Sequence, residues 1–290
     1  MRKVINYGDK TEENLIIALG YFDAVHKGHK KVLEKAVSIA KSKGATPAVL
    51  IFTGGKHGKD IFNLFERSIK LFSTKIEVVI VKELSSDFLK KSSVEFLDEL
   101  SALYHIDGVV CGSDFTFGNG AKGNVKTLIE FFGKDKVFCE NLVEENNEKI
   151  SSTAIKTALE KGDILLANEL LGDNYFIAGK VIKGKALGKT IGFPTANISI
   201  SDNKFPLKMG VYLTFSIIGG KAYPSITNVG NQPTVNGQNS VLETHIKGFS
   251  GDLYDKILTV YFVSYIREIK KFSSLEELKN QLVKDLSYTI

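Results

Sequence analysis

Hydrophobic residues in the first part of the chain form short apolar runs, separated by stretches with helical spacing. Between the runs, apolar residues recur three or four positions apart, from Val32 to Ala40 and again from Val94 to Leu103. Gly44 follows the first of these stretches, where a glycine typically ends a helix. Alternating strands and helices predict a parallel sheet wrapped by helices on both faces. The runs that we interpret as buried strands are Leu15–Leu19, Ala48–Phe52, Val78–Val81, Val109–Cys111 and Val137–Cys139.

The pattern changes near Tyr175 to closely spaced apolar runs with Gly, Asn and Pro between them. Such spacing predicts an antiparallel barrel or sandwich. The last residues predict one helix, with Ser273 and Glu276 as a capping box and one face of leucines. We therefore expect two domains, residues 1–172 and 176–290. The runs are Ile177–Ile182, Val211–Ile218, Ala222–Thr227, Val241–Ile246 and Ile257–Ile266, and the leucines are Leu275, Leu278, Leu282 and Leu286.

Composition narrows the class of protein. The 290 residues are 43% hydrophobic and 24% charged, which excludes a disordered or fibrous chain. No apolar run reaches the roughly 18 residues that span a bilayer, and the N-terminal residues lack the apolar core of a secretory signal. We therefore expect a cytoplasmic protein without a membrane partner. Cys111 and Cys139 lie in apolar runs, so buried reduced thiols are expected rather than a disulfide or a metal site.

Charge is distributed unevenly along the chain. Residues 1–174 carry 24 basic and 25 acidic side chains, whereas residues 175–290 carry 14 and 8, a net charge of +6. Such a basic half could bind nucleic acid or a phosphorylated small molecule. Only 3 of the 38 basic residues are arginines, the residues that read base edges most often. We therefore expect no nucleic-acid partner.

The segment Gly20–His29 follows the first predicted strand and opens the first predicted helix. Gly20 permits a tight turn, and Gly28 lets the backbone approach a ligand. His26 and His29 project to one side at the helix start, where free amides favour an anion. Two imidazoles there suit the charge that develops on an attacked phosphate. From the spacing alone, a capping role, or a zinc pair completed by Asp23, stays open.

A second candidate site lies in the β-rich half. Glycines and lysines alternate there, and exposed backbone amides with lysines can hold phosphates. Thr195 and Asn197 follow and offer the hard oxygen donors that suit Mg²⁺. From the pattern alone, a turn-rich hairpin is the competing interpretation. The glycines are Gly179, Gly184, Gly188 and Gly192.

Several motifs in a fixed order, from about Gly20 to Phe272, carry a resemblance to a known family. The sequence resembles the bacterial bifunctional riboflavin kinase/FAD synthetases. The resemblance implies an α/β plus β architecture: a Rossmann-like nucleotidyltransferase domain with a parallel sheet, then an antiparallel β-barrel riboflavin kinase domain with a terminal helix. The motifs are Gly20–His29, Cys111–Gly118, Ile150–Lys156, Gly192–Asn197, Asn228–Thr234, Glu243, Asp252–Tyr254 and Arg267–Phe272.

For the kinase domain, the resemblance implies that riboflavin and ATP give FMN and ADP. Glu243 is then the catalytic base that takes the proton of the riboflavin 5′-hydroxyl. Thr195 and Asn197 are implied as ligands of Mg²⁺, the cofactor, and as ATP-binding residues together with Gly184 and Gly188. The implied flavin-binding residues are Asn228 and Arg267.

For the adenylyltransferase domain, the resemblance implies that FMN and a second ATP give FAD and pyrophosphate. His26 and His29 are the implied catalytic residues, which stabilise the transition state and the leaving pyrophosphate. The implied ATP-binding residues are Gly20, Phe22, Asp23, Gly28, Asp114, Ser152, Thr153 and Lys156.

The sequence departs from the family at three places. The Pro-His-Pro that the family carries after its second strand is absent from Ile51–Lys56. Lys156 and Lys189 stand where the family has arginine, which keeps the charge but loses the bidentate fork. Two alternatives therefore stay open: a riboflavin kinase with a weak or inactive adenylyltransferase domain, and a non-enzymatic flavin- or RNA-binding module. The oligomeric state is not predictable from these patterns.

Overall fold

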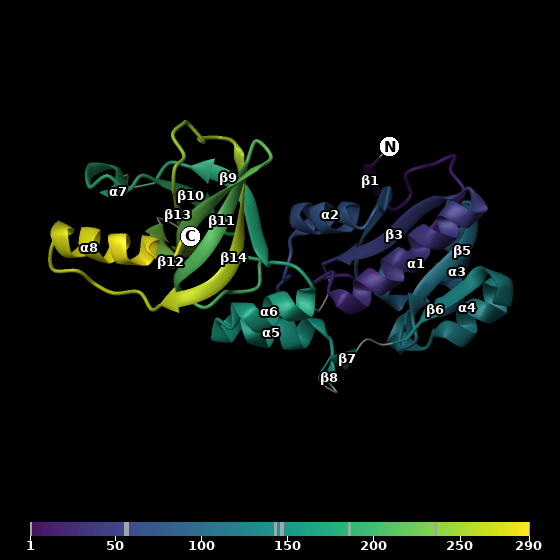
Figure 1. Ribbon diagram of the computed structural model, residues 1–290. Coiled ribbons are helices and arrows are strands. Elements are labelled where there is room, and N and C mark those ends of the chain that lie inside the picture. Colours follow the sequence, from purple (N-terminus) through teal and green to yellow (C-terminus); the bar gives the residue numbers. More distant parts are fainter. Residues whose placement is uncertain are drawn as a thin grey trace. The chain divides into compact units, whose positions relative to one another are not determined.

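The first unit is built on a six-stranded parallel sheet with the strand order β1-β4-β3-β2-β5-β6 (Figure 1). The computed structural model describes residues 2–54, 58–141, 144–145, 148–184, 187–234 and 237–289. By their contacts, Met1–Gly58 and Asn63–Ser152 form this unit, and Lys59–Phe62 and Thr153–Ile290 form the second. The strands are β1 (Lys3–Asn6), β2 (Leu15–Leu19), β3 (Thr46–Thr53), β4 (Val78–Glu83), β5 (Ile106–Gly112) and β6 (Val137–Glu140).

Helices cover both faces of this sheet, because successive residues of β2 point to opposite sides. Ile16 and Ala18 belong to a buried cluster with residues of α1 and α2, whereas Leu15, Ile17 and Leu19 belong to one with residues of α3 and α4. The predicted doubly wound sheet is therefore confirmed. The helices are α1 (Lys27–Lys43), α2 (Leu64–Ser73), α3 (Ser93–Leu103) and α4 (Val125–Phe132).

Capping side chains fix where these helices begin and end. Before α2, the Asn63 side chain accepts from the Glu66 N–H, and the Glu66 carboxylate accepts from the Asn63 N–H, a complete capping box. His26 occupies the equivalent position before α1. At the other end of α1, Gly44 adopts φ 64°, which confirms the predicted stop.

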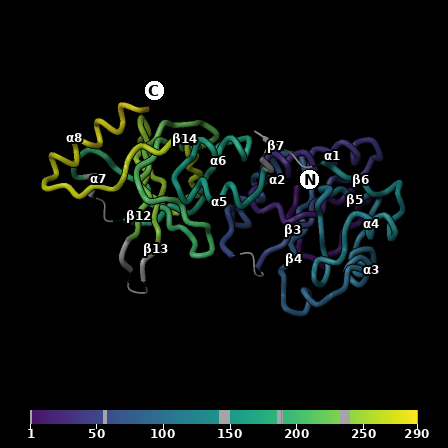
Figure 2. Tube along the Cα trace, turned by 90° about the horizontal axis from the view of Figure 1, so that it is seen from below, coloured from purple at the N-terminus to yellow at the C-terminus, as the bar shows by residue number. Residues whose placement is uncertain are grey.

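The second unit contains a closed antiparallel barrel with the strand order β10-β13-β12-β11-β14-β9, so the barrel interpretation is confirmed over the sandwich. The helices α7 and α8 lie at the same end of this unit in both views (Figures 1 and 2). The strands are β9 (Phe176–Ile182), β10 (Thr195–Ser199), β11 (Gly210–Ile218), β12 (Lys221–Thr234), β13 (Gly237–Ile246) and β14 (Ile257–Arg267). The helices are α5 (Ser152–Lys161), α6 (Ile164–Leu171), α7 (Leu187–Thr190) and α8 (Leu275–Leu286), and a two-stranded sheet, β7 (Glu144–Glu145) and β8 (Glu148–Lys149), precedes them.

Buried hydroxyl groups line three neighbouring strands of the barrel. The Thr227 hydroxyl on β12 lies 2.8 Å from that of Thr214 on β11 and 3.0 Å from that of Thr244 on β13. One step along the strands, the Ser216 and Ser225 hydroxyls lie 2.8 Å apart. These buried polar groups satisfy one another, so the barrel carries no desolvation penalty from them.

The segment 59–62, which follows β3 in the chain, packs with the barrel unit. The buried Lys204 Nζ donates to the Ile61 carbonyl over 2.9 Å, and the Phe205 N–H donates to the Asp60 carbonyl over 2.7 Å. The Phe62 ring is fully buried, with its centroid 5.4 Å from that of Tyr175. The chain therefore contributes four residues of its first half to the second unit.

The terminal helix α8 confirms the predicted helix but corrects two details. Its cap is Ser274, which accepts from the Glu277 N–H, one residue later than the predicted pair. The Glu277 carboxylate also accepts from the Ser273 N–H and hydroxyl, so both serines bond to Glu277, one through its backbone and one through its side chain. The predicted leucine face is at most half-buried, and the fully buried residue of the helix is Asp285.

Two other expectations differ from the structure. Cys111 is buried, but Cys139 is exposed because β6 is the edge strand of its sheet. The strands β1 and β10 lack a long apolar run, and the sequence did not predict them. Among the described residues, no helix combines the length and the apolar character that crossing a bilayer requires.

Candidate functional site

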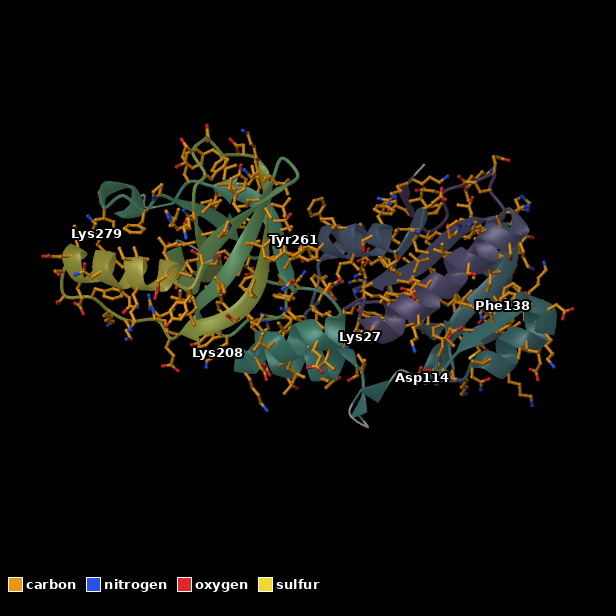
Figure 3. The ribbon with its side chains drawn as sticks, in the orientation of Figure 1. Lys27, Asp114, Phe138, Lys208, Tyr261 and Lys279 are labelled. Carbon is orange, nitrogen blue, oxygen red and sulfur yellow. The ribbon has the colours of Figure 1, made fainter. Side chains whose placement is uncertain are left out.

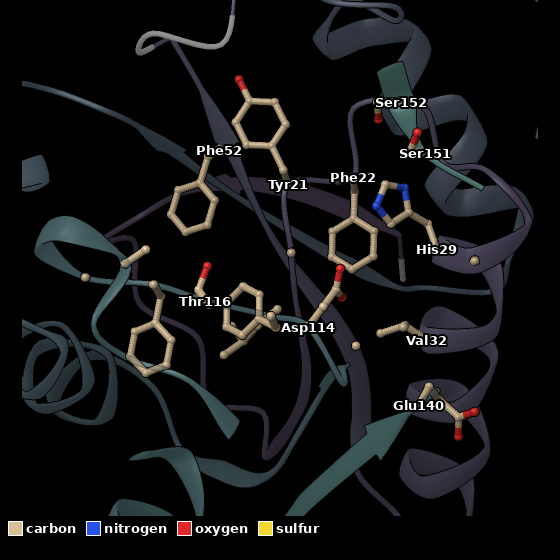
Figure 4. A pocket seen from close by; sticks show the side chains of 18 of the residues that line it. Tyr21, Phe22, His29, Val32, Phe52, Asp114, Thr116, Glu140, Ser151 and Ser152 are labelled. Carbon is tan, nitrogen blue, oxygen red and sulfur yellow. The ribbon is translucent and has the colours of Figure 1, made fainter. Parts of the chain in front are cut away.

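A cavity of about 560 Å³ lies in the first unit, where the parallel strands end. Its wall includes the last residue of β2 and residues that follow it, Phe52 of β3, and the segments after β5 and β6. The carboxyl ends of parallel strands are where such sheets bind ligands. Figure 4 shows the polar side chains of His29, Asp114, Ser151 and Ser152 among aromatic rings. The cavity therefore pairs an apolar wall with convergent polar groups, as small-molecule sites do.

The loop between β2 and α1 holds a strained backbone at this cavity. Phe22 and Val25 are both buried and adopt φ 49° and φ 46°, conformations that cost non-glycine residues about 1–3 kcal/mol each. A Cβ at Gly20 would lie 2.8 Å from the Phe22 ring. Gly20 is thus required for the packing of Phe22, and the strain is concentrated beside the histidines.

The two histidines form one structural unit at the start of α1. The Nδ1 of His26, the capping residue, accepts from the His29 N–H over 3.2 Å, and the two rings stack with centroids 3.7 Å apart. The Phe22 ring lies 4.9 Å from the His29 ring. This arrangement confirms that both imidazoles lie on one side of the helix start.

His29 is held in its neutral form. Burial, then the neighbouring His26, then the Arg67 charge lower the pKa of His29 well below its usual value. Among the described residues, the buried His29 Nδ1 has no hydrogen-bond partner. A neutral imidazole can donate one N–H to a ligand oxygen at neutral pH. Across the described part of the chain, no cluster of three or more His, Cys, Asp or Glu could hold a metal, so the zinc interpretation gains no support.

The cavity brings together most of the residues predicted for adenylyl transfer, but not all. Asp114 lines it from the segment after β5 (Figures 3 and 4), and Ser152 lines it from the start of α5. Asp23 is buried outside the cavity wall, and Thr153 and Lys156 belong to the second unit. The predicted residues in the wall are Gly20, Phe22, His26, Gly28, His29, Asp114 and Ser152.

The segment without Pro-His-Pro begins at the end of β3. Phe52 lines the cavity, and Gly54 adopts φ 70°. Residues 55–57 lie outside the described part of the chain.

Three residues predicted for the kinase meet in one row across the barrel. Glu243 on β13 pairs laterally with Asn197 on β10 and with Asn228 on β12. Lateral partners in a sheet project to the same face, with Cβ atoms about 4.5–5.5 Å apart. Thr195 lies two residues before Asn197, on the same face of β10. The row therefore places a carboxylate, two amides and a hydroxyl on one barrel surface.

Two glycines before this row allow close approaches, Gly184 to the side chain of Asn197 and Gly188 to the backbone of Phe193. A Cβ at Gly184 would lie 2.4 Å from the Asn197 side-chain nitrogen, and a Cβ at Gly188 would lie 2.2 Å from the Phe193 carbonyl oxygen. Neither position can hold a larger residue without a shift. The side-chain oxygens of Thr195, Asn197 and Glu243 are hard donors, which fits Mg²⁺.

Arg267 lies at the end of β14 and is bonded to the terminal helix. Its Nε and Nη2 donate to the two Asp285 oxygens over 3.0 and 2.6 Å, and its Nη1 donates to the Glu268 carbonyl. The structure thus gives this arginine a role in holding α8. Its flavin-binding role stays a prediction.

Two features of the cavity escaped the sequence analysis. The first is its aromatic wall, of which Phe115 and Phe117 lie inside the quoted motif Cys111–Gly118 and could have been noticed there. The second is Arg67, whose only sequence signal is that arginine is rare in this chain.

Comparisons with known proteins cover nearly the whole chain. A family model described as FAD synthetase matches residues 8–154, and one described as riboflavin kinase matches residues 171–290. A Bacillus subtilis (strain 168) protein named bifunctional riboflavin kinase/FMN adenylyltransferase is 35% identical over 93% of this chain and 90% of its own. A Haemophilus influenzae protein of the same name is 33% identical over 97% and 95%. A crystal structure titled as a macrolide-efflux protein from Streptococcus pneumoniae matches with a TM-score of 0.86 and 30% identity, over 99% of this chain and 98% of that one.

Proposed function

Because the chain belongs to the family of bifunctional riboflavin kinase/FMN adenylyltransferases, we propose that its two reactions are divided between residues 1–172 and 176–290. The enzyme phosphorylates riboflavin to FMN with ATP, releasing ADP. It then adenylylates FMN to FAD with a second ATP, releasing pyrophosphate. Adenylyl transfer is assigned to the first range and phosphoryl transfer to the second. Consumption of ATP supports a cytoplasmic location, and the scarcity of arginine supports the absence of a nucleic-acid partner.

In the kinase half, Glu243 accepts the proton of the riboflavin 5′-hydroxyl as its oxygen attacks the γ-phosphorus of ATP. The new P–O bond forms as the bond to ADP breaks. Asn228 lies beside Glu243 in the lateral row and orients the flavin hydroxyl end. Thr195 and Asn197 would hold Mg²⁺, which would supply neutralisation of the phosphate charge. The close approach of Gly184 to Asn197 supports a phosphate cradle formed by that loop.

In the adenylyltransferase half, a phosphate oxygen of FMN attacks the α-phosphorus of ATP, and the bond to pyrophosphate breaks. His26 and His29 donate to the phosphate oxygens on which charge develops. The neutral His29 imidazole lies at a helix start, so it acts together with the field of the free amides without the cost of a buried cation. Gly20 and Gly28 admit the phosphates close to the backbone, and Asp114 and Ser152 contribute polar groups from the wall.

The stacked histidine pair at the carboxyl edge of the sheet is the observation that carries the adenylyltransferase assignment. It is intact although Pro-His-Pro is missing. A cavity of about 560 Å³ falls within the range of small-molecule sites.

Chromatographic product analysis tests the proposal. Purified protein with Mg²⁺ and ATP receives either riboflavin or FMN, and we expect FAD from both. Glu243→Gln should lower FMN formation by about 10²–10⁴-fold and leave FAD formation from FMN unchanged. His29→Gln should lower FAD formation by about 10²–10³-fold and leave FMN formation unchanged.

The two alternatives give different products. FMN as the only product would leave a riboflavin kinase with an inactive first half. If the protein bound flavin without turnover, and Glu243→Gln did not change this binding, the protein would be a flavin-binding module and not an enzyme.

A further inference from the structure

Arg67 is the largest fully buried side chain among the described residues, and it contacts two residues that line the adenylyltransferase cavity. Burying a guanidinium costs several kcal/mol unless its surroundings compensate. A packed apolar side chain would fill the same volume more cheaply. Arginine is also rare here, with 3 arginines among 38 basic residues. The retention of an arginine at this position therefore calls for an explanation beyond packing.

Two contacts of Arg67 lead to residues of the cavity wall, Phe52 and Tyr21. From α2, its Nη1 donates to the Phe52 carbonyl at the end of β3 over 2.8 Å. Its guanidinium carbon lies 5.8 Å from the Tyr21 ring centroid in the loop after β2. The Tyr21 hydroxyl in turn donates to the Gly54 carbonyl over 3.4 Å. One side chain thus joins the two strand ends that form this side of the cavity.

The planar guanidinium group of arginine is needed for this arrangement. The guanidinium donates in its own plane and presents its face or edge to an aromatic ring, whereas an ammonium is a point charge without that geometry. Lysine at this position would keep the charge and lose the simultaneous contacts to Phe52 and Tyr21. Substitution by lysine can therefore separate the effect of the guanidinium contacts from the effect of the charge.

We propose that Arg67 is a positioning residue for adenylyl transfer, which fixes Tyr21 and the end of β3 at the cavity. It touches neither substrate in this role. The charge of Arg67 also acts on the cavity residue His29, where it favours the neutral imidazole after burial and His26. This inference rests on the proposed assignment of adenylyl transfer to the first unit.

The test compares Arg67→Met, which removes the charge and keeps most of the volume, with Arg67→Lys, which keeps the charge. Each is made in the full-length enzyme, and FMN formation from riboflavin serves as the internal control for the second unit, which does not contain Arg67. We expect Arg67→Met to lower kcat for FAD formation at least 10-fold, with KM for FMN and ATP changed less than threefold and FMN formation unchanged. Arg67→Lys should recover part of the loss. Arg2→Met is the matched control, because the exposed Arg2 also lies over a ring, that of Phe72, and should change neither reaction.

Two further measurements separate positioning from a structural role. NMR titration of the His29 imidazole without substrates should show a higher pKa in Arg67→Met than in the wild type or Arg67→Lys; the charged groups that act on this imidazole are His26 and Arg67. A double-mutant cycle with Tyr21→Leu should be non-additive in kcat.

The inference is overturned if Arg67→Met and Arg67→Lys both leave kcat unchanged, or if both reactions fall together. Should Arg67→Met fail to fold, a selective loss of kcat in Arg67→Lys still supports the inference, and full activity in that variant overturns it. A wild-type enzyme that makes no FAD would refute the assignment of adenylyl transfer, whereas the titration reports on Arg67 without any turnover.

Discussion

His29 shows at the scale of a single residue how burial sets a chemical state. Its pKa is lowered well below 6.5 by burial, His26 and Arg67, so the unfolded chain takes up a proton first as pH falls. The stability contributed by neutral His29 is therefore complete above about pH 6.5 and is lost as pH falls below it, by up to about 1.4 kcal/mol per pH unit.

Replacing His29 by Gln should flatten this dependence. Urea unfolding of the two proteins between pH 7 and pH 5 measures the difference in free energy. The exposed His105, changed to Gln, is the control and should leave the wild-type slope unchanged. An equal slope in all three proteins would mean that His29 is not depressed in the folded state.

Lys75 illustrates backbone strain away from any site. It is exposed, follows α2, and adopts φ 70°, the left-handed conformation in which glycine usually ends helices. Lys75→Gly should raise the free energy of unfolding by about 1 kcal/mol, since the Cβ that disfavours this conformation is removed. Gly44→Ala, at φ 64° after α1, is the reverse change and should lower stability by a similar amount. Thermal unfolding checks both, and a lower melting temperature for Lys75→Gly would contradict the argument.

At the scale of elements, the sequence predicts those features that depend on neighbouring residues, such as helix caps. His26 caps α1 by accepting from the His29 N–H, an interaction within four residues that the sequence analysis left open as an alternative. The sequence did predict that the two imidazoles project to one side. The cap of α8 was misplaced by one residue, because Ser273 with Glu276 and Ser274 with Glu277 satisfy the same spacing. Only the observed register distinguishes these pairs.

Long-range contacts account for what the sequence could not predict. The strand β10 has only short apolar character and exists because β9 and β13 pair with it on both sides. Arg67 gained its importance from Phe52 and Tyr21, which belong to other elements. Cys139 is exposed because β6 is an edge strand, and strand order is not visible in a run of apolar residues.

The terminal helix α8 is held to the barrel by a buried ion pair. Asp285 is fully buried, and Arg267, the partner of its carboxylate, is 14% exposed. Asp285→Asn removes one charge and leaves the other buried, so we expect a loss of about 3–5 kcal/mol from the barrel unit. Limited proteolysis should then cleave at α8 in the variant before the rest of the chain.

The exposed pair of Lys180 and Asp255 offers the matched control. Its side chains are 59% and 82% exposed, so Asp255→Asn should cost less than about 1 kcal/mol. If the two substitutions lowered stability equally, burial would not determine how much the Arg267–Asp285 pair stabilises the barrel unit.

At the scale of the whole molecule, a residue's position in the chain does not decide to which unit it belongs. Phe62 comes between β3 and α2 of the sheet unit, yet it is buried among Tyr175 and Phe176 of the barrel unit. Phe62→Ala removes a buried aromatic ring and should cost about 3–5 kcal/mol. We expect this cost to fall on the barrel, so FMN formation should be inactivated at a lower temperature than in the wild type while FAD formation from FMN keeps its wild-type inactivation temperature.

Phe65→Ala separates this effect from a general weakening of the segment. Phe65 lies three residues further on, in the first turn of α2, and is 51% exposed, so its truncation should change neither inactivation temperature by more than a degree or two. If Phe62→Ala instead lowered the inactivation temperature of FAD formation alone, the segment would stabilise the sheet unit to which its neighbours in the chain belong. Loss of kinase stability alone would establish that a substitution within the first 172 residues acts on the reaction assigned to the second half.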